Sequence, residues 1–263
     1  MSRLDGIFGA ARAEGRLVVS IYLTVGHPDL DASLEFARAA LAGGAEILEI
    51  GVPFSDPLAD GPTIQAASFA ALECGVTLDD CLDLVRTLRA ESEAGLLLMG
   101  YVNPFLAAGW EQLAADAGAA GADGFIIPDL PPEEAGEALA AFAGHDLTLI
   151  PMLAPTSSAA RLDLGTRQAA GFIYCVALTG TTGVRSEMDA DLGGFLQRVR
   201  ERTGVPLVVG FGISTSEHVI RLRGIADGFI VGSAFVRLAA ETGPARRAEA
   251  AEEFVRGLAA AAR

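Results

Sequence analysis

Residues 206–231 read PLVVGFGISTSEHVIRLRGIADGFIV, which is an apolar run, a polar amphipathic segment and a second apolar run. We expect strands at Pro206–Phe211 and Gly228–Val231, with a helix at Ser214–Leu222 between them. In a sheet with one face in water, polar and apolar residues alternate along each strand, and neither of these runs shows that alternation. Continuous apolar runs are typical of parallel strands that helices cover on the outside. This stretch therefore predicts one strand–helix–strand unit.

The same unit recurs towards the N-terminus. Further strand-like runs are Leu17–Thr24, Ile47–Val52, Gly95–Tyr101, Gly124–Pro128, Thr148–Leu153 and Gly171–Ala177. Further helical segments are Leu30–Ala42, Thr63–Ala71, Leu78–Glu93, Trp110–Ala120, Glu133–Phe142, Ser157–Gln168, Leu192–Thr203 and Pro244–Ala262. Eight strands that alternate with helices predict a closed (β/α)8 TIM barrel, and 263 residues are close to the roughly 250 typical of that fold. We expect a single domain over residues 1–263. The competing fold is an open doubly wound sheet, but no G-x-G-x-x-G motif follows the first strand.

Charge and basic residue type exclude several functions. The formal net charge of −15 opposes non-specific binding to nucleic acid, which needs a positive surface. All 19 basic residues are arginine, and the chain has no lysine. Schiff-base aldolases and enzymes that carry pyridoxal phosphate on their own lysine are therefore excluded, as is a P-loop.

The cysteines and histidines show no pattern of a disulfide framework or a metal site. The cysteines are three in number, which favours a reduced, cytoplasmic protein; they are Cys74, Cys81 and Cys175. Of the histidines, only His27 follows a predicted strand, so we expect no zinc site and no metal. No apolar run reaches the length of a membrane span, and the N-terminus does not resemble a signal peptide.

The second predicted strand contains the strongest catalytic signal. Residues 48–61 read LEIGVPFSDPLADG. Leu48 and Ile50 suit packing under helices, so by alternation Glu49 points into the barrel, although an outward Glu49 paired with an arginine is the alternative. Active sites of this fold lie at the carboxyl ends of the strands. Asp60 follows there on a proline-rich loop, and a catalytic role and a helix-capping role are about equally supported.

Two glycine turns after the last two strands resemble phosphate sites. They are Val209–Ser214 and Val231–Ala234. Gly212 and Gly232 would let backbone amides approach an anion, and Ser233 would add a hydroxyl at a helix N-terminus. The alternative is a pair of tight turns that merely need glycine. Their location after strands seven and eight favours phosphate.

The connection after the sixth strand, residues 177–186, is rich in glycine and threonine. Such a loop is either a mobile lid or an ordinary surface turn. As a lid it would bring Thr182, Gly183 and Arg185 to a phosphate on closure. The residues themselves leave both interpretations open.

The chain resembles the tryptophan synthase α-subunit family. Residues 48–61 are similar to that family's signature throughout, and the other matching blocks are Tyr22–Gly26, Gly100–Pro104, Pro128–Pro131, Leu153–Thr156, Thr182–Gly183, Gly210–Ser214 and Val231–Ala234. They follow the expected order from about residue 16 to residue 240. The resemblance departs at Ile21, where the family usually has proline, and at Leu178 and Thr181 in the sixth connection.

The resemblance implies a lyase that splits indole-3-glycerol phosphate into indole and glyceraldehyde 3-phosphate in the last stage of L-tryptophan biosynthesis. It implies that Glu49 is the acid–base group and that Asp60 stabilises positive charge on the indole nitrogen. The other implied substrate-binding residues are Tyr22, Met99, Ile126, Tyr174, Thr182, Gly183, Phe211, Gly212, Ile230, Gly232 and Ser233. Tyr174 would orient one of the two carboxyl groups, and the glycine and serine amides would hold the phosphate.

The resemblance also implies a complex of two α and two β subunits, in which the β subunit receives indole and carries pyridoxal phosphate. No cofactor is expected in this chain. Its contact surface would include Pro53–Asp60, Asn103–Pro104 and Pro128–Pro132. The alternatives are a lyase without a β partner, another phosphate-binding barrel such as an isomerase, and an inactive barrel kept as a scaffold.

Overall fold

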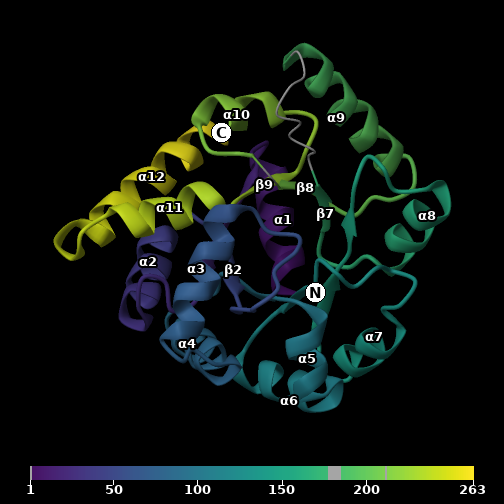
Figure 1. Cartoon of the computed structure of the whole chain (residues 1–263). Coiled ribbons are helices and arrows are strands. Elements are labelled where there is room, and N and C mark those ends of the chain that lie inside the picture. Colours follow the sequence, from purple (N-terminus) through teal and green to yellow (C-terminus); the bar gives the residue numbers. More distant parts are fainter. Residues whose placement is uncertain (1, 177–184, 211) are drawn as a thin grey trace.

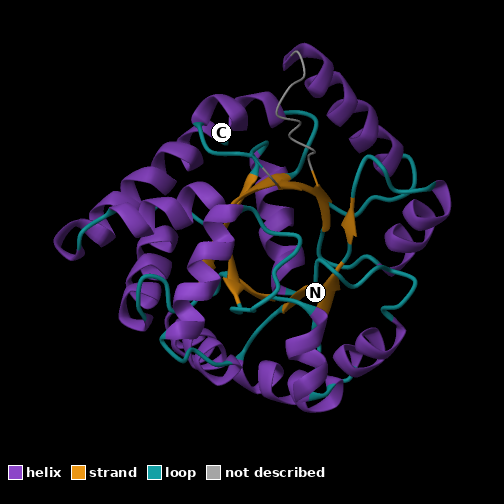
Figure 2. Ribbon diagram, in the orientation of Figure 1, coloured by secondary structure: helices purple, strands orange, loops and turns teal. Residues whose placement is uncertain are grey.

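The computed structural model describes residues 2–176, 185–210 and 212–263. Within these ranges the strands form one parallel sheet in the order β5-β4-β3-β2-β1-β9-β8-β7-β6. Their bounds are β1 Val18–Thr24, β2 Ile47–Gly51, β3 Gly95–Met99, β4 Gly124–Ile126, β5 Thr148–Ile150, β6 Met152–Leu153, β7 Ile173–Val176, β8 Leu207–Gly210 and β9 Gly228–Val231. Helices surround this ring of strands (Figure 2). The structure confirms the predicted (β/α)8 TIM barrel.

The fifth predicted strand, Thr148–Leu153, is divided at Pro151 into β5 and β6. These two pieces are the two ends of the sheet order, so the barrel closes where the chain passes through the proline. Proline has no N–H group to donate to a neighbouring strand. Its carbonyl still accepts a hydrogen bond of 3.0 Å from the Tyr174 N–H, which keeps this point joined to β7.

The helices lie close to their predicted positions (Figure 1). Those that match are α2 Leu30–Ala42, α3 Pro62–Glu73, α4 Leu78–Glu91, α6 Trp110–Ala120, α7 Gly136–Ala143, α8 Ala159–Gln168, α10 Ser216–Leu222 and α12 Arg247–Ala261. The predicted start of α9 at Leu192 is wrong, because this helix spans Arg185–Arg200. A short 3-10 turn, Pro244–Arg246, precedes α12. Helices α1 Arg3–Glu14 and α5 Val102–Ala108 were not predicted, and of α11 Ser233–Glu241 only the start at Ser233 was expected.

Helix α1 closes the barrel at the amino ends of the strands. Ser2 and Asp5 form a reciprocal cap at its start, and Leu4, Phe8 and Ala11 are buried along one face. These three side chains belong to the same core cluster as inward residues of the strands. In Figure 1, α1 is seen through the ring of strands. The cap and the helical spacing of the three apolar residues are signals that the sequence analysis did not use.

Alternation along β2 separates the two parts of the core. Ile47 belongs to the cluster inside the barrel, whereas Leu48 and Ile50 belong to the cluster between the strands and the helices. Glu49 therefore points inward, as the sequence analysis expects. Within the described ranges no helix combines the length and apolar character needed to cross a membrane.

Candidate active site

A cavity of about 370 Å³ opens at the carboxyl ends of the strands. It is lined from several strand ends and from the loops after β2, β8 and β9. The lining residues are Tyr22, Glu49, Asp60, Gly61, Ile64, Met99, Tyr174, Gly212, Ile213, Ser214, Ile230, Gly232, Ser233, Ala234 and Arg237. Most of the residues that the sequence analysis selected therefore meet in one place. The local signals came from segments far apart in the chain, and barrel closure brings them together.

Glu49 is completely buried, and only one of its oxygens is hydrogen-bonded. The Ser20 hydroxyl donates to Glu49 Oε1 at 2.8 Å, while Glu49 Oε2 has no hydrogen-bond partner in the described structure. Burial raises the pKa of Glu49 to about 8, because the charged form loses its hydration. Glu49 thus lines the cavity with one carboxyl oxygen that has no hydrogen-bond partner in the described structure, and its pKa lies well above the ordinary value of 4.5.

Asp60 lies on the loop between β2 and α3. The Tyr101 hydroxyl donates to Asp60 Oδ2 at 2.9 Å and accepts a hydrogen bond of 3.0 Å from the Ala59 N–H. Burial raises the pKa of Asp60 to about 6, and the hydrogen bond from Tyr101 opposes that rise. Helix α3 is capped by Gly61, so Asp60 is not its N-cap residue. The alternative role for Asp60 is therefore wrong, and its carboxylate is available to the cavity.

Two tyrosine rings form walls of the cavity, and each lies against a glycine. A Cβ atom added at Gly51 would overlap the Tyr22 ring, and one added at Gly210 would overlap the Tyr174 ring. Burial raises the pKa of Tyr174, and the charges of Glu49 and Asp60 raise it further. Tyr174 therefore lines the same cavity as both carboxyl groups, and its role in orienting Glu49 or Asp60 stays a prediction.

The remaining apolar positions divide between the cavity and the core. Met99 and Ile230 line the cavity at the ends of β3 and β9. Ile126, at the end of β4, is fully buried in the core cluster that also contains Tyr174. It lies in the core of the barrel and is not among the residues that line the cavity. Its side chain supports the pocket from behind, and direct contact with a ligand stays a prediction.

The loops after β8 and β9 form the other end of the cavity. Gly212 has a φ of 78°, which favours glycine, and Gly232 precedes α11. The first N–H groups of a helix have no partner within it, so α11 directs them at the cavity from Ser233 onward. Arg237, one turn further along α11, also lines the cavity. The sequence predicts a helix N-terminus at Ser233 but not how far the helix extends, so Arg237 was not selected.

Several residues that line or support the cavity were missed. Ser20 is a polar residue between Val19 and Ile21 in a mostly apolar strand, a local signal that was left unused. Tyr101 is placed by the fold beside Asp60, which no local pattern indicates. The predicted Thr182, Gly183 and Phe211 lie outside the described residues, as does the side chain of Arg185. Over the described ranges, no three His, Cys, Asp or Glu side chains are grouped to hold a metal ion.

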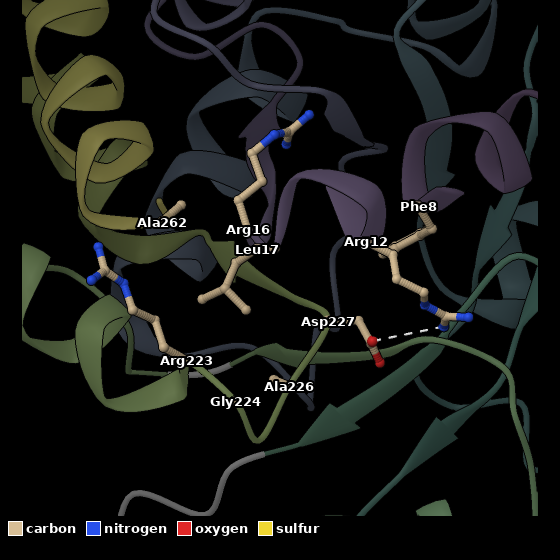
Figure 3. A pocket seen from close by; sticks show the side chains of 10 residues that line it. Phe8, Arg12, Arg16, Leu17, Arg223, Gly224, Ala226, Asp227 and Ala262 are labelled. Atoms are coloured by element: carbon tan, nitrogen blue, oxygen red, sulfur yellow. Dashed lines mark ion pairs between the residues drawn. The ribbon is translucent and has the colours of Figure 1, made fainter. Parts of the chain in front are cut away.

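A second cavity, of about 220 Å³, lies at the amino ends of the strands (Figure 3). Three arginines line this cavity. The Arg12 guanidinium is 3.9 Å from the Asp227 carboxylate, and the Arg16 guanidinium is 2.7 Å from the Glu46 carboxylate. Arg223 Nε donates a 2.9 Å hydrogen bond to the carbonyl of Ala261. Each guanidinium is thus already paired within the protein, with an acidic side chain or a backbone carbonyl.

Comparison with known proteins identifies the same family from end to end. The family model described as "Tryptophan synthase alpha chain" matches residues 8–263. The tryptophan synthase alpha chain of Roseiflexus sp. (strain RS-1) is 51% identical over 259 residues, which is 98% of this chain and 99% of that protein. The corresponding protein of Chloroflexus aggregans is 47% identical, covering 99% of this chain and 98% of that one.

Solved structures agree with the sequence matches. The crystal structure of tryptophan synthase subunit alpha from Legionella pneumophila superposes with a TM-score of 0.92 at 34% identity, covering 99% of this chain and 98% of that chain. A chain in the aminoacrylate-bound tryptophan synthase of M. tuberculosis gives a TM-score of 0.91 at 35% identity, with 100% of both chains covered. The fold and the family are therefore supported by independent comparisons.

Proposed function

The chain belongs to the tryptophan synthase alpha chain family, a lyase of indole-3-glycerol phosphate in tryptophan biosynthesis, and we propose that the cavity between Glu49 and Arg237 is where it cleaves this substrate. The observation that carries this proposal is the difference between the two carboxyl groups of one cavity. The pKa of Asp60 is about 6 and that of Glu49 is about 8. Near pH 7, Asp60 is therefore mostly ionised while Glu49 is mostly protonated, so one site holds a carboxylate and a carboxylic acid.

The charges of the cavity match the two ends of the substrate. Both carboxyl groups and the apolar side chains of Met99 and Ile230 are suited to an indole ring. The start of α11 and Arg237 are suited to a phosphate. In a chain of net charge −15, a cation and helix N–H groups at one end of the cavity direct the substrate in a single orientation.

Each carboxyl group has a defined part in the proposed cleavage. Protonated Glu49 gives its proton to carbon 3 of the indole, and ionised Asp60 stabilises the positive charge that develops on the ring N–H. The Glu49 carboxylate then takes the proton of the glycerol hydroxyl next to the ring. The carbon–carbon bond breaks, its electron pair returns to the ring, and the hydroxyl carbon becomes the aldehyde. Glu49 is left protonated, so no other reactant is consumed.

We further propose that the chain works with a β subunit, as two α and two β subunits, and that pyridoxal phosphate belongs to the partner. This chain has no lysine to form a Schiff base with that cofactor. Leu58, on the proline-rich loop after β2, is 92% exposed, and Leu106 on α5 is 49% exposed. Exposed apolar side chains next to a site that releases an apolar product favour a docking surface there.

The direct test is indole release by the Glu49→Gln variant, with and without a β subunit. We expect the amide to reduce kcat by about 10² to 10⁴, because it cannot exchange the proton. Unchanged circular dichroism would show that the barrel is intact. Turnover close to that of the parent chain would refute the assignment of Glu49. Gel filtration with the β subunit tests the rival form, a lyase that acts without this partner.

A further inference from the structure

Ser20 lies in the middle of β1, between apolar neighbours, and has no exposed surface. Its hydroxyl donates to Glu49 Oε1 at 2.8 Å, and Glu49 is equally buried. In the pairing of β1 with β2, Tyr22 is opposite Glu49 and Ser20 is opposite Ile47. Ser20 is therefore one inward position deeper than Glu49. It does not line the cavity, so it reaches the carboxyl group from below.

The surroundings of Glu49 make this contact important. The polar and titratable groups that face it are Ser20 and Tyr22 on β1, Tyr174 on β7 and, across the cavity, Asp60. The Tyr22 hydroxyl is 3.2 Å from Thr24 Oγ1 and is engaged there. On β3, the residue paired with Glu49 is the buried Leu97. Among the described hydrogen bonds, the one that reaches the Glu49 carboxyl group comes from Ser20.

We propose that Ser20 is a positioning residue, which fixes Glu49 Oε1 from below so that Oε2 faces the substrate and stabilises the carboxylate that forms when Oε2 gives up its proton. The inference rests on the proposed role of Glu49 and assigns the oxygen that transfers the proton. A hydrogen bond donated to a carboxylate is stronger than one to the neutral acid, so it lowers the cost of ionisation in a buried site. It also removes one rotational freedom from the acid before substrate arrives.

The expected direction of change in a Ser20→Ala variant follows from the loss of this donor. Without the hydroxyl, the buried carboxylate is less stable and the pKa of Glu49 rises above its value of about 8. We expect kcat to fall about tenfold or more, because a hydrogen bond to a charged group is lost. The alkaline limb of the pH profile of kcat should move upward by about one pH unit. The KM should stay nearly constant, since Ser20 does not line the cavity.

A matched control variant removes a buried serine hydroxyl at another position. Ser33 is also buried, and its hydroxyl accepts from the Gly26 N–H at 2.8 Å and donates to the Asp29 carbonyl at 3.0 Å. Ser33→Ala therefore deletes a buried hydroxyl away from Glu49. We expect it to lower the unfolding midpoint without moving the alkaline limb. Ser20→Cys, which keeps a weaker donor of similar size, should fall between the parent and Ser20→Ala.

A titration of Glu49 itself separates this inference from the proposed function. Carboxyl-labelled glutamate gives one nuclear magnetic resonance signal that is absent in Glu49→Gln, and its midpoint reports the pKa of Glu49. We expect a higher midpoint in Ser20→Ala than in the parent chain. An unchanged midpoint and pH limb in Ser20→Ala, with Glu49→Gln inactive, would overturn the role of Ser20 alone. An active Glu49→Gln variant would instead refute the proposed function.

Discussion

At the scale of a single residue, the proposed catalytic role of Glu49 conflicts with the stability of the fold. Its side chain has no exposed surface, and burial raises its pKa to about 8. The unfolded chain ionises at the ordinary value of 4.5, whereas the folded chain retains the proton to higher pH. The free energy of unfolding that Glu49 contributes is therefore greatest below the unfolded pKa. It falls as the pH rises towards the folded pKa.

We predict that Glu49→Gln gains stability over the parent chain as the pH rises from about 4.5 to 8. The amide does not titrate, so it does not incur the growing cost of an ionised buried group. The gain at pH 8 should be on the order of a few kcal/mol, because each pH unit between the unfolded and folded pKa corresponds to about 1.4 kcal/mol. Urea unfolding of both proteins at pH 5, 6, 7 and 8 measures it. A difference in the free energy of unfolding that stays constant from pH 5 to pH 8 would show that burial does not raise the pKa of Glu49.

Asp60 depends on a partner that the fold supplies. We predict that Tyr101→Phe moves the acid limb of kcat/KM for indole release to higher pH, by up to about one pH unit. Asp60 must be ionised to stabilise positive charge, and loss of the hydrogen bond from Tyr101 raises its pKa above about 6. Asp60→Asn should instead lose activity at every pH. If the acid limb of kcat/KM does not move in Tyr101→Phe, then it does not report the ionisation of Asp60.

At the scale of single helices, α11 brings two groups suited to an anion to the cavity where we propose that the phosphate binds. Its N-terminus supplies unpaired N–H groups, and Arg237 adds a positive charge one turn later. The sequence predicts that backbone amides at the two glycine turns hold the phosphate. The structure adds a side chain to this site because α11 begins directly after Gly232 and one of its faces borders the cavity.

We predict that Arg237→Gln raises the KM for indole-3-glycerol phosphate about three- to tenfold, a range that fits an exposed ion pair. Binding of free indole, measured by calorimetry, should not change, since indole has no phosphate. Arg237→Lys keeps the charge and should stay close to the parent. The increase in KM should diminish at high salt, which screens exposed charges. Equal weakening of indole and phosphate binding would point to damage of the whole cavity.

At the scale of the molecule, the exposed apolar loops beside the cavity are the surface where we expect the proposed β subunit to bind and receive the apolar product. We predict that Leu58→Ser weakens association with a β subunit at least about tenfold, because a 92% exposed leucine placed in a dry interface contributes roughly 1.5 kcal/mol or more. Analytical ultracentrifugation of the mixture measures this change. Ile220→Ser on α10, where the side chain is 51% exposed, is the control and should assemble normally. Normal assembly of Leu58→Ser would place the partner surface elsewhere.

The fold could be read from the sequence because its signals are local and repeated. Each strand is a short apolar run, and each helix has its own period and caps, so neighbouring residues suffice to define them. The strand boundary at Pro151 was wrong because tertiary contacts decide where the barrel closes. Helix α1 was missed for another reason, since its cap and apolar spacing are local signals that were left unused. The interpretation of residues 1–263 as one domain stays a prediction.

Local sequence was sufficient to predict the barrel, the inward direction of Glu49 and the two glycine turns after β8 and β9. Alternation along β2 fixes the side of Glu49, and glycine turns depend on backbone geometry that few other residues adopt. The contacts of Tyr101 with Asp60, of Ser20 with Glu49 and of Arg237 with the cavity required the complete fold. These pairs join residues from different strands and loops. Their distances depend on the register and closure of the whole sheet, which no local segment encodes.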